Sequence, residues 1–362
     1  MRRIIVIVPE LLGEPSVLGQ KLPGLERIAE LGSLFRLQPL PTVETPEALY
    51  LGLKPGEGQL RQGPLTIAAL GADPPERSTH FHLSLLSFDD GLARVPKQAE
   101  ATDEEMSLLM KEAEKLNTKL LTIVTGSGLD HGLVWEDLGE QHTMAPSECD
   151  GRPVKACLPE GDGETQLRRL IDDSINLLSD LEINQRRIDE ELPPLNLLWP
   201  WGQGTRCPVP NLALRRGEPA LVVSASARLQ GLSRLAGYRH VDWREMGVGT
   251  NTRLAKMAEL ALQEPVSILM MDSVASFRAR GMFDEAEWFA RESDAVLFKP
   301  FFEQALTSPT QITVLAPGSP SGLGARYRTR DENENSIPFD ERALVEKGLS
   351  CSNLWEAVAA SF

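Results

Sequence analysis

The beginning of the chain alternates between apolar runs and a helical pattern, in the order that α/β proteins use. Residues 3–8 are almost continuously apolar, which is the pattern of a parallel strand buried on both faces. An amphipathic segment follows over residues 22–31 and stops at Gly32, and residues 34–37 form a second short apolar run. We therefore predict that the chain opens with a strand, a helix and a second apolar segment of one domain.

The middle of the chain follows a different pattern. Residues 39–75 are rich in Pro and Gly, and after them we expect strands at 80–88 and 119–124. Two amphipathic helices are expected as well, one from Thr102 to about residue 116 and one over residues 164–179. We predict that this segment is a separate, smaller α+β domain.

The last third returns to strands that alternate with helices. We expect strands at 219–224, 266–271 and 311–315, and helices at 254–262 and 283–306. Such alternation is typical of a doubly wound, mostly parallel sheet. We predict a discontinuous α/β domain made of residues 1–42 and 205–362, with residues 43–204 inserted into it.

Composition narrows the classes of function. Hydrophobic residues make up 41% and charged residues 25% of the 362 residues, the ordinary range for a soluble globular protein. Acidic residues outnumber basic ones 52 to 37, for a net charge of -15, which disfavours nucleic acid and anionic membranes as partners. The apolar run at the start is too short for a signal peptide. The four cysteines have no zinc-site spacing, and we expect reduced thiols in a cytoplasmic protein.

One segment carries a family resemblance. Residues 196–204 read Asn-Leu-Leu-Trp-Pro-Trp-Gly-Gln-Gly, which resembles the Asn-x-x-Trp-x-Trp-Gly-x-Gly segment of archaeal-type cofactor-independent phosphoglycerate mutases, enzymes of the alkaline-phosphatase superfamily. Shorter stretches resemble other segments of that family in the same order: 62–65, 158–161, 184–187, 247–252, 339–342 and 348–349. The resemblance implies a phosphatase-like α/β domain that holds two divalent metals such as Mn, Zn or Mg, with a smaller inserted substrate domain.

The metal-ligand positions of that family are replaced in this chain. The family's first Asp corresponds to Pro9-Glu10, and its Asp-x-x-x-His motif corresponds to Asp272 with Ser276, or in a second register to Ala275 and Ala279. Its later Asp-His pair falls at residues 317–318, which are Pro and Gly, and all five histidines precede residue 241. From this loss we predict that no cofactor is required.

Few residues remain as candidates for the chemistry. Thr45 lies near the position of the family's nucleophilic Ser, and its alternative role is that of a Thr-Pro turn residue. A lone hydroxyl without an adjacent base or metal is a weak nucleophile. On the substrate side the resemblance leaves His82, His131 and Arg186, each of which has a structural role as its alternative.

The function we predict is that of a degenerate homologue of the cofactor-independent phosphoglycerate mutases, without two-metal phosphoryl transfer, that acts as a binding or regulatory protein. The alternative is an active mutase or phosphohydrolase with a rebuilt site, so the sequence leaves open whether the protein is an enzyme. A small phosphorylated acid is the expected ligand, and a protein partner or a second copy of the chain is a further candidate. Neither nucleic acid nor a membrane is expected as a partner.

Overall fold

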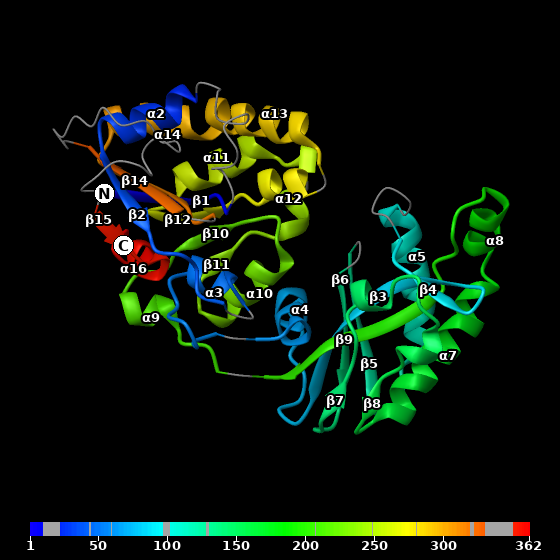
Figure 1. Cartoon of the computed structure of the whole chain (residues 1–362). Coiled ribbons are helices and arrows are strands. Elements are labelled where there is room, and N and C mark those ends of the chain that lie inside the picture. Colours follow the sequence, from blue (N-terminus) through cyan, green and yellow to red (C-terminus); the bar gives the residue numbers. More distant parts are fainter. Residues whose placement is uncertain are drawn as a thin grey trace. The chain divides into compact units, whose positions relative to one another are not determined.

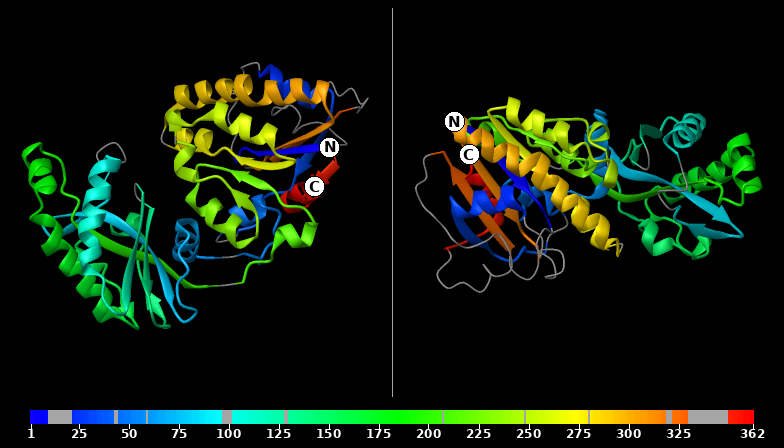
Figure 2. Two further views of the ribbon diagram at one scale, coloured as in Figure 1. Left: turned by 180° about the vertical axis from the view of Figure 1, so that it is seen from behind. Right: turned by 90° about the horizontal axis from the view of Figure 1, so that it is seen from above.

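The computed structural model divides the chain into two compact units (Figures 1 and 2). Unit 1 contains residues 1–59 and 209–362, and unit 2 contains residues 60–208. Our sequence-based boundaries lay after residues 42 and 204, whereas the structure assigns residues 43–59 to unit 1. The structure describes residues 1–9, 22–42, 45–58, 60–96, 102–127, 130–206, 208–247, 249–279, 281–318, 322–329 and 350–362. No helix among these residues is both long and apolar enough to span a membrane.

Unit 1 is built on an eight-stranded sheet with the order β11-β10-β12-β1-β13-β14-β2-β15. The first five strands in this order run parallel, and the antiparallel strand β14 joins them to β2 and β15. The strand bounds are β1 (Arg2–Ile7), β2 (Ser33–Leu37), β10 (Leu221–Val223), β11 (Arg239–His240), β12 (Val266–Met270), β13 (Thr310–Ala316), β14 (Gly322–Arg328) and β15 (Ser350–Ser352). The predicted α/β class with a mostly parallel sheet is confirmed.

Helices cover both faces of this sheet (Figure 1). One face carries α2 (Pro23–Glu30), α11 (Leu254–Gln263), α13 (Phe283–Ser293) and α14 (Lys299–Thr307), which bury one large apolar cluster against β1, β12 and β13. The remaining helices of unit 1 are α3 (Glu47–Tyr50), α9 (Leu212–Arg216), α10 (Ala227–Leu235), α12 (Ser273–Ala279) and α16 (Leu354–Ala359). Because β1 has neighbours on both edges and helices on both faces, the residues from Ile4 to Ile7 are completely buried.

The helix predicted over residues 283–306 contains a turn of π-helix at Asp294–Phe298, between α13 and α14. Asp294 is buried at this turn, and its carboxylate accepts hydrogen bonds from the backbone N–H groups of Gly24 and Leu25 at 2.9 and 2.8 Å. These N–H groups belong to the first turn of α2 and have no acceptor within their own helix. Asp294 therefore caps α2 from a distant part of the chain.

Unit 2 is built on an antiparallel sheet in which β3 (Thr79–Asp89) pairs with β4 (Leu92–Arg94), β6 (Asp130–Trp135) and β9 (Leu197–Thr205). Strand β5 (Leu121–Ser127) pairs with β6. Strands β7 (Gln141–His142) and β8 (Glu160–Gly161) form a separate two-stranded antiparallel sheet. The helices are α4 (Gln62–Leu70), α5 (Asp103–Ala113), α6 (Pro146–Cys149), α7 (Glu164–Ser179) and α8 (Glu182–Asp189). The sequence analysis anticipated β3, β5, α5 and α7, but not β6 or β9.

The two glycine-rich segments that carry the family resemblance pack against each other in unit 2. A Cβ atom on Gly63, in the first turn of α4, would lie 2.2 Å from the backbone carbonyl oxygen of His80 on β3. Gly202 on β9 has a φ of +62°, and a Cβ atom there would lie 2.7 Å from the Cβ atom of Gln62. Only glycine permits this close approach of helix to sheet. These motif residues therefore serve the packing of α4.

We expect the Gly63→Ala substitution to destabilise unit 2. The added methyl group would force α4 away from β3, and overpacking of this kind costs about 1–3 kcal/mol in the free energy of unfolding. Urea unfolding followed by circular dichroism measures the loss. An unchanged unfolding midpoint would show that α4 is free to shift outward and would contradict the packing role of Gly63.

Candidate functional site

The parallel strands of unit 1 bring several polar residues to one edge of the sheet. Strands β10, β12, β1 and β13 run in the same direction, so their carboxyl ends meet at one edge, where open α/β sheets generally bind ligands. Ser224 follows β10 and Asp272 follows β12, directly before α12. We call this edge, together with α3 and the start of α10, the carboxyl edge.

An ion pair joins two elements at the carboxyl edge that are far apart in the sequence. Arg228, in the first turn of α10, donates from Nε to Oε1 of Glu47 at 2.8 Å and from Nη2 to Oε2 at 3.4 Å. Glu47 is the first residue of α3, and its side chain is 13% exposed. A two-point contact of this kind fixes the orientation of the carboxylate and offsets its charge.

Two other ionisable groups respond to Glu47. Burial raises the pKa of Asp272, and the negative charge of Glu47 raises it further. Burial also raises the pKa of Tyr50 to about 12, with smaller contributions from Glu47 and Asp272. Glu47 is therefore close enough to Tyr50 and Asp272 to influence their protonation, and a carboxyl group with a raised pKa in a cluster of this kind is a frequent mark of a functional site.

Thr45 lies directly before this cluster in the chain. Its backbone carbonyl oxygen accepts a hydrogen bond from the N–H group of Ala48 at 3.1 Å, in the turn that starts α3. Its side chain is completely buried. A phosphoryl group would reach the Thr45 hydroxyl only if the surrounding residues moved. The placement of Thr45 near the family's nucleophile stays a prediction.

The Gly-rich segment at residues 247–252 also reaches the carboxyl edge. Gly247 has a φ of +68°, and a Cβ atom there would lie 2.2 Å from the backbone oxygen of Asn251, so the tight turn requires glycine. The hydroxyl of Thr252 lies 3.3 Å from that of Ser273, the residue after Asp272. This loop therefore contributes hydroxyl groups beside Asp272.

The described part of the chain does not contain the donor set of a two-metal centre. Nowhere in it do three or more His, Cys, Asp or Glu side chains form a group that could hold a metal ion. The described acids at the carboxyl edge include Glu47, Asp272 and Asp242, which follows the parallel strand β11. Both oxygens of Glu47 are bonded to Arg228, and the Asp242 carboxylate is bonded to Arg244. Four of the five histidines lie in unit 2, and His240 lies on β11 at the end of the unit 1 sheet. Glu10 and residues 339–342 are outside the described residues.

The three substrate-side candidates from the sequence are not brought together. The register of β3 and β6 places Leu83 opposite His131 and His82 opposite Gly132, so the two imidazoles lie on opposite faces of the sheet. His131 accepts a hydrogen bond at Nδ1 from the backbone N–H of Gly126 at 3.0 Å. Arg186 on α8 has a side chain that is 57% exposed and pairs with Glu105. His131 and Arg186 thus have structural contacts, and their role in binding a substrate stays a prediction.

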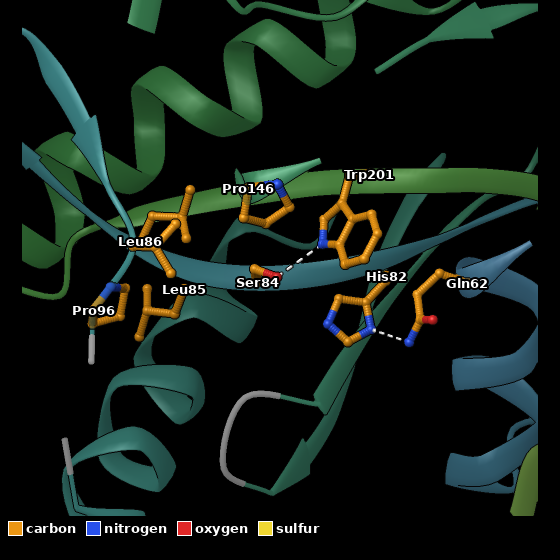
Figure 3. A pocket seen from close by; sticks show the side chains of 9 residues that line it. Gln62, His82, Ser84, Leu85, Leu86, Pro96, Pro146 and Trp201 are labelled. Carbon is orange, nitrogen blue, oxygen red and sulfur yellow. Dashed lines mark hydrogen bonds between the residues drawn. The ribbon is translucent and has the colours of Figure 1, made fainter. Parts of the chain in front are cut away.

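His82 lines a pocket of about 310 Å³ within unit 2 (Figure 3). The pocket also contacts Trp201 on β9 and Gln62 on α4, and these two residues belong to the segments that resemble the mutase family. Our sequence analysis selected His82 but missed Trp201 and Gln62 as candidate binding residues. The signal that would have found them is the Trp-Pro-Trp-Gly-Gln-Gly segment itself, which we had used only for the resemblance.

Comparison with known proteins was made at the level of sequence and of structure. No family model matches the chain. It is 22% identical over 367 residues to the 2,3-bisphosphoglycerate-independent phosphoglycerate mutase of Methanosarcina barkeri, covering 94% of this chain and 92% of the relative. The mutase of the same name from Methanosarcina mazei is 21% identical and covers 92% and 91%. That of Methanothrix thermoacetophila is 24% identical over 231 residues, 61% of this chain and 57% of the relative's length.

The resemblance to cofactor-independent phosphoglycerate mutases is confirmed. Two solved structures agree in fold with this mutase homologue: the cofactor-independent phosphoglycerate mutase of Thermoplasma acidophilum, with a TM-score of 0.64, and a Pyrococcus horikoshii protein, with a TM-score of 0.74. Each is 17% identical in sequence, and the alignments cover 99% of this chain and 98% and 96% of the other two. The homologue therefore has the alkaline-phosphatase-like α/β fold that the motifs implied.

The comparisons correct one prediction. We had expected no cofactor, whereas the relatives are 2,3-bisphosphoglycerate-independent mutases, a class that uses divalent metals such as Mn²⁺ or Co²⁺. The prediction was wrong because it weighed only the replaced ligand positions and not the requirement of the class as a whole. Divalent metals therefore have to be supplied in every assay of this protein, even though the described donors do not fit a two-metal centre.

We expect the Asp272→Asn substitution to stabilise unit 1 increasingly as the pH rises. A carboxyl group whose folded-state pKa is raised favours folding below its unfolded pKa, and this contribution is lost as the pH rises through the folded pKa. The Asn side chain stays neutral and avoids the loss, which amounts to about 1.4 kcal/mol for each unit of pKa shift. Urea unfolding of both proteins from about pH 4 to about pH 8 measures the difference. A difference that is constant or shrinks with pH would contradict the coupling.

Proposed function

We propose that this protein is a degenerate phosphoglycerate mutase homologue that acts as a binding or regulatory protein and does not perform two-metal phosphoryl transfer. The observation that carries this proposal is the ion pair between Glu47 and Arg228 at the carboxyl edge. An arginine of the same chain occupies both oxygens of Glu47. A further acid there, Asp272, is followed four residues later by Ser276, which in one of the two registers stands where the family motif has His.

The electrostatics of a two-metal centre also support the proposal that this protein does not perform two-metal phosphoryl transfer. Two dications about 4 Å apart repel each other by roughly 16 kcal/mol at an effective dielectric constant near 20. Several carboxylates and imidazoles must offset this repulsion. Of the described carboxylates at the carboxyl edge, Glu47 is paired with Arg228 and Asp242 with Arg244, and Asp272 has a raised pKa that disfavours its charged form.

The alternative is an active mutase or phosphohydrolase with a rebuilt site. Two observations favour it: the relatives carry the name of an active enzyme, and Thr45 lies two residues before Glu47 at the carboxyl edge. In that case Thr45 would accept the phosphoryl group, and Asp272 would take part in the site. A direct assay separates the two functions.

We expect no interconversion of 3-phosphoglycerate and 2-phosphoglycerate above background, because the described carboxyl edge lacks the charge to support the transition state. The assay couples 2-phosphoglycerate to enolase and follows phosphoenolpyruvate by its absorbance, with Mn²⁺, Co²⁺, Mg²⁺ and Zn²⁺ each supplied in turn. The Methanosarcina mazei mutase, assayed in parallel, is the positive control.

Metal-dependent turnover by the intact chain would overturn the proposal and support the active enzyme. The Thr45→Ala variant would then test the rebuilt site, with Thr45→Ser as the conservative rescue and the exposed Thr307→Ala as the matched control. Turnover that survives Thr45→Ala would exclude Thr45 as the acceptor.

A retained binding function predicts that 3-phosphoglycerate or phosphoenolpyruvate stabilises the folded protein. A ligand that binds only the folded state at about 100 times its Kd adds about 2.7 kcal/mol, which raises Tm by roughly 5 °C or more. Differential scanning fluorimetry measures the shift, with sodium sulfate at the same ionic strength as the control. Equal shifts with sulfate and with the phosphorylated acids would count against a specific site for them.

A further inference from the structure

Two of the four cysteines lie together in the interior of unit 2. Cys149, the last residue of α6, and Cys157, which follows the 3₁₀ turn Val154–Ala156, are 0% and 1% exposed and carry free thiols. Both belong to one small apolar cluster, whose other buried members are Leu86, Ala93, Val154, Ile171, Leu197 and Trp199. The fold therefore places two thiols in one apolar environment.

The two thiols are also direct neighbours. Burial raises the pKa of the Cys149 thiol to about 12, and Cys157 contributes to this rise through its charge and through a hydrogen bond between the two side chains. A hydrogen bond between two thiols places one sulfur atom against the other. The pair is therefore close enough for a bond between its sulfur atoms to form with little movement.

The backbone holds the segment between the two cysteines against the hairpin of β3 and β4. Three backbone hydrogen bonds of 2.8, 3.0 and 2.9 Å make this connection, from the N–H groups of Gly151, Val154 and Ala93 to the carbonyl oxygens of Ala93, Gly91 and Arg152. The approach of the two thiols therefore follows from the path of the backbone and does not depend on mobile side chains.

The same segment forms a thin surface layer over the thiols. Of the nine residues from Cys149 to Cys157, six are exposed, and only Val154 and the two cysteines are buried. A small oxidant therefore reaches the sulfur atoms through local opening of this layer, without the unfolding of unit 2. Opening to water also removes the burial that raises the pKa of the Cys149 thiol, so that a reactive thiolate can form.

The apolar surroundings decide which modification of the pair is stable after the layer closes. A sulfinate or a metal-bound thiolate would bring charge into the cluster, where the cost of burying charge is high. A disulfide carries no charge and needs no hydrogen-bond partner, and its two sulfur atoms take up no more room than the two thiols. The cluster therefore favours the disulfide over the other oxidised forms.

We propose that Cys149 and Cys157 form a redox modification site, at which hydrogen peroxide converts the two thiols into an intramolecular disulfide. One sulfur atom attacks the peroxide, so that an S–O bond forms, the O–O bond breaks and water leaves. The second sulfur atom attacks the resulting sulfenic acid, so that the S–S bond forms and the hydroxyl group leaves as water with the thiol proton. The two thiols are oxidised, and one peroxide is reduced to two water molecules.

Peptide mapping of the full chain tests this bond directly. The reduced protein is treated with hydrogen peroxide in buffer, its remaining thiols are blocked with N-ethylmaleimide in urea, and it is digested with trypsin. Cleavage after Lys155 separates the two cysteines, so we expect peptides 120–155 and 156–168 to appear as one crosslinked species that dithiothreitol separates. A link from either cysteine to a different one, or sulfinic acids at both without a crosslink, would overturn the proposal.

The same map, repeated across a range of urea concentrations, distinguishes local opening from unfolding. We expect the crosslink to form in buffer without urea, because the folded segment already holds the thiols side by side. A crosslink that forms only within the unfolding transition would show that the folded chain does not prepare the bond, and it would also overturn the proposal.

Oxidation should stabilise unit 2, because a disulfide restricts the unfolded chain. We expect peroxide treatment to raise the Tm by roughly 5 °C, a shift that dithiothreitol reverses and that differential scanning fluorimetry measures. The Cys157→Ala variant should lose both the shift and the crosslinked peptide. Cys351→Ala, at an exposed cysteine of unit 1, is the matched control and should retain both.

A Tm of the parent chain that does not rise when the crosslink forms would contradict the placement of the two thiols, because the bond would then strain the segment that carries them. The site lies within unit 2 and involves no residue of the carboxyl edge. These results are therefore independent of whether unit 1 performs phosphoryl transfer.

Discussion

Arg228 and Glu47 form a two-point ion pair at the carboxyl edge of unit 1, and the charge of the candidate site depends on it. The pair joins α10 to α3 through two residues that are 181 positions apart in the sequence. Asp272 is a partly buried acid nearby. Burial raises the pKa of its carboxyl group, and the negative charge of Glu47 raises this pKa further. An internal guanidinium at this edge bonds to one of its acids and so changes what the edge can bind.

The scaffold around this edge agrees in fold with the two solved structures reported above. β1 is buried between β12 and β13, the helices α2, α11, α13 and α14 enclose one apolar cluster, and Asp294 caps α2 from the π-helical turn. None of these contacts requires a metal or a substrate. Packing is therefore separable from catalysis in this fold, and a chain that is 21–24% identical to the relatives reported above retains the packing.

In unit 2 the residues of the motifs that resemble the mutase family have structural roles. Gly63 and Gly202 allow α4 to approach β3 and β9, and the same approach brings Gln62 next to His82 and sets Trp201 beside it. The segments that resemble the mutase family thus build a close helix–sheet contact, and the pocket of unit 2 lies beside that contact.

The sequence alone determined the class of the fold, because apolar periodicity reports burial directly: continuous runs marked β1, β12 and β13, and helical spacing marked α2, α11 and the long helix through α13 and α14. It did not predict β6, which pairs with β3 as well as with its neighbour β5, or β9, which pairs with the distant strand β3 and is rich in Gly, Pro and Trp. Residue identity also led us to predict that the family's His positions are replaced. Only the tertiary structure decided that His82 and His131 lie on opposite faces of a sheet, that Arg228 pairs with Glu47, and that Trp201 and Gln62 meet at His82. Such contacts depend on strand register and on helix docking, which bring together residues far apart in the chain and are not encoded in any local pattern.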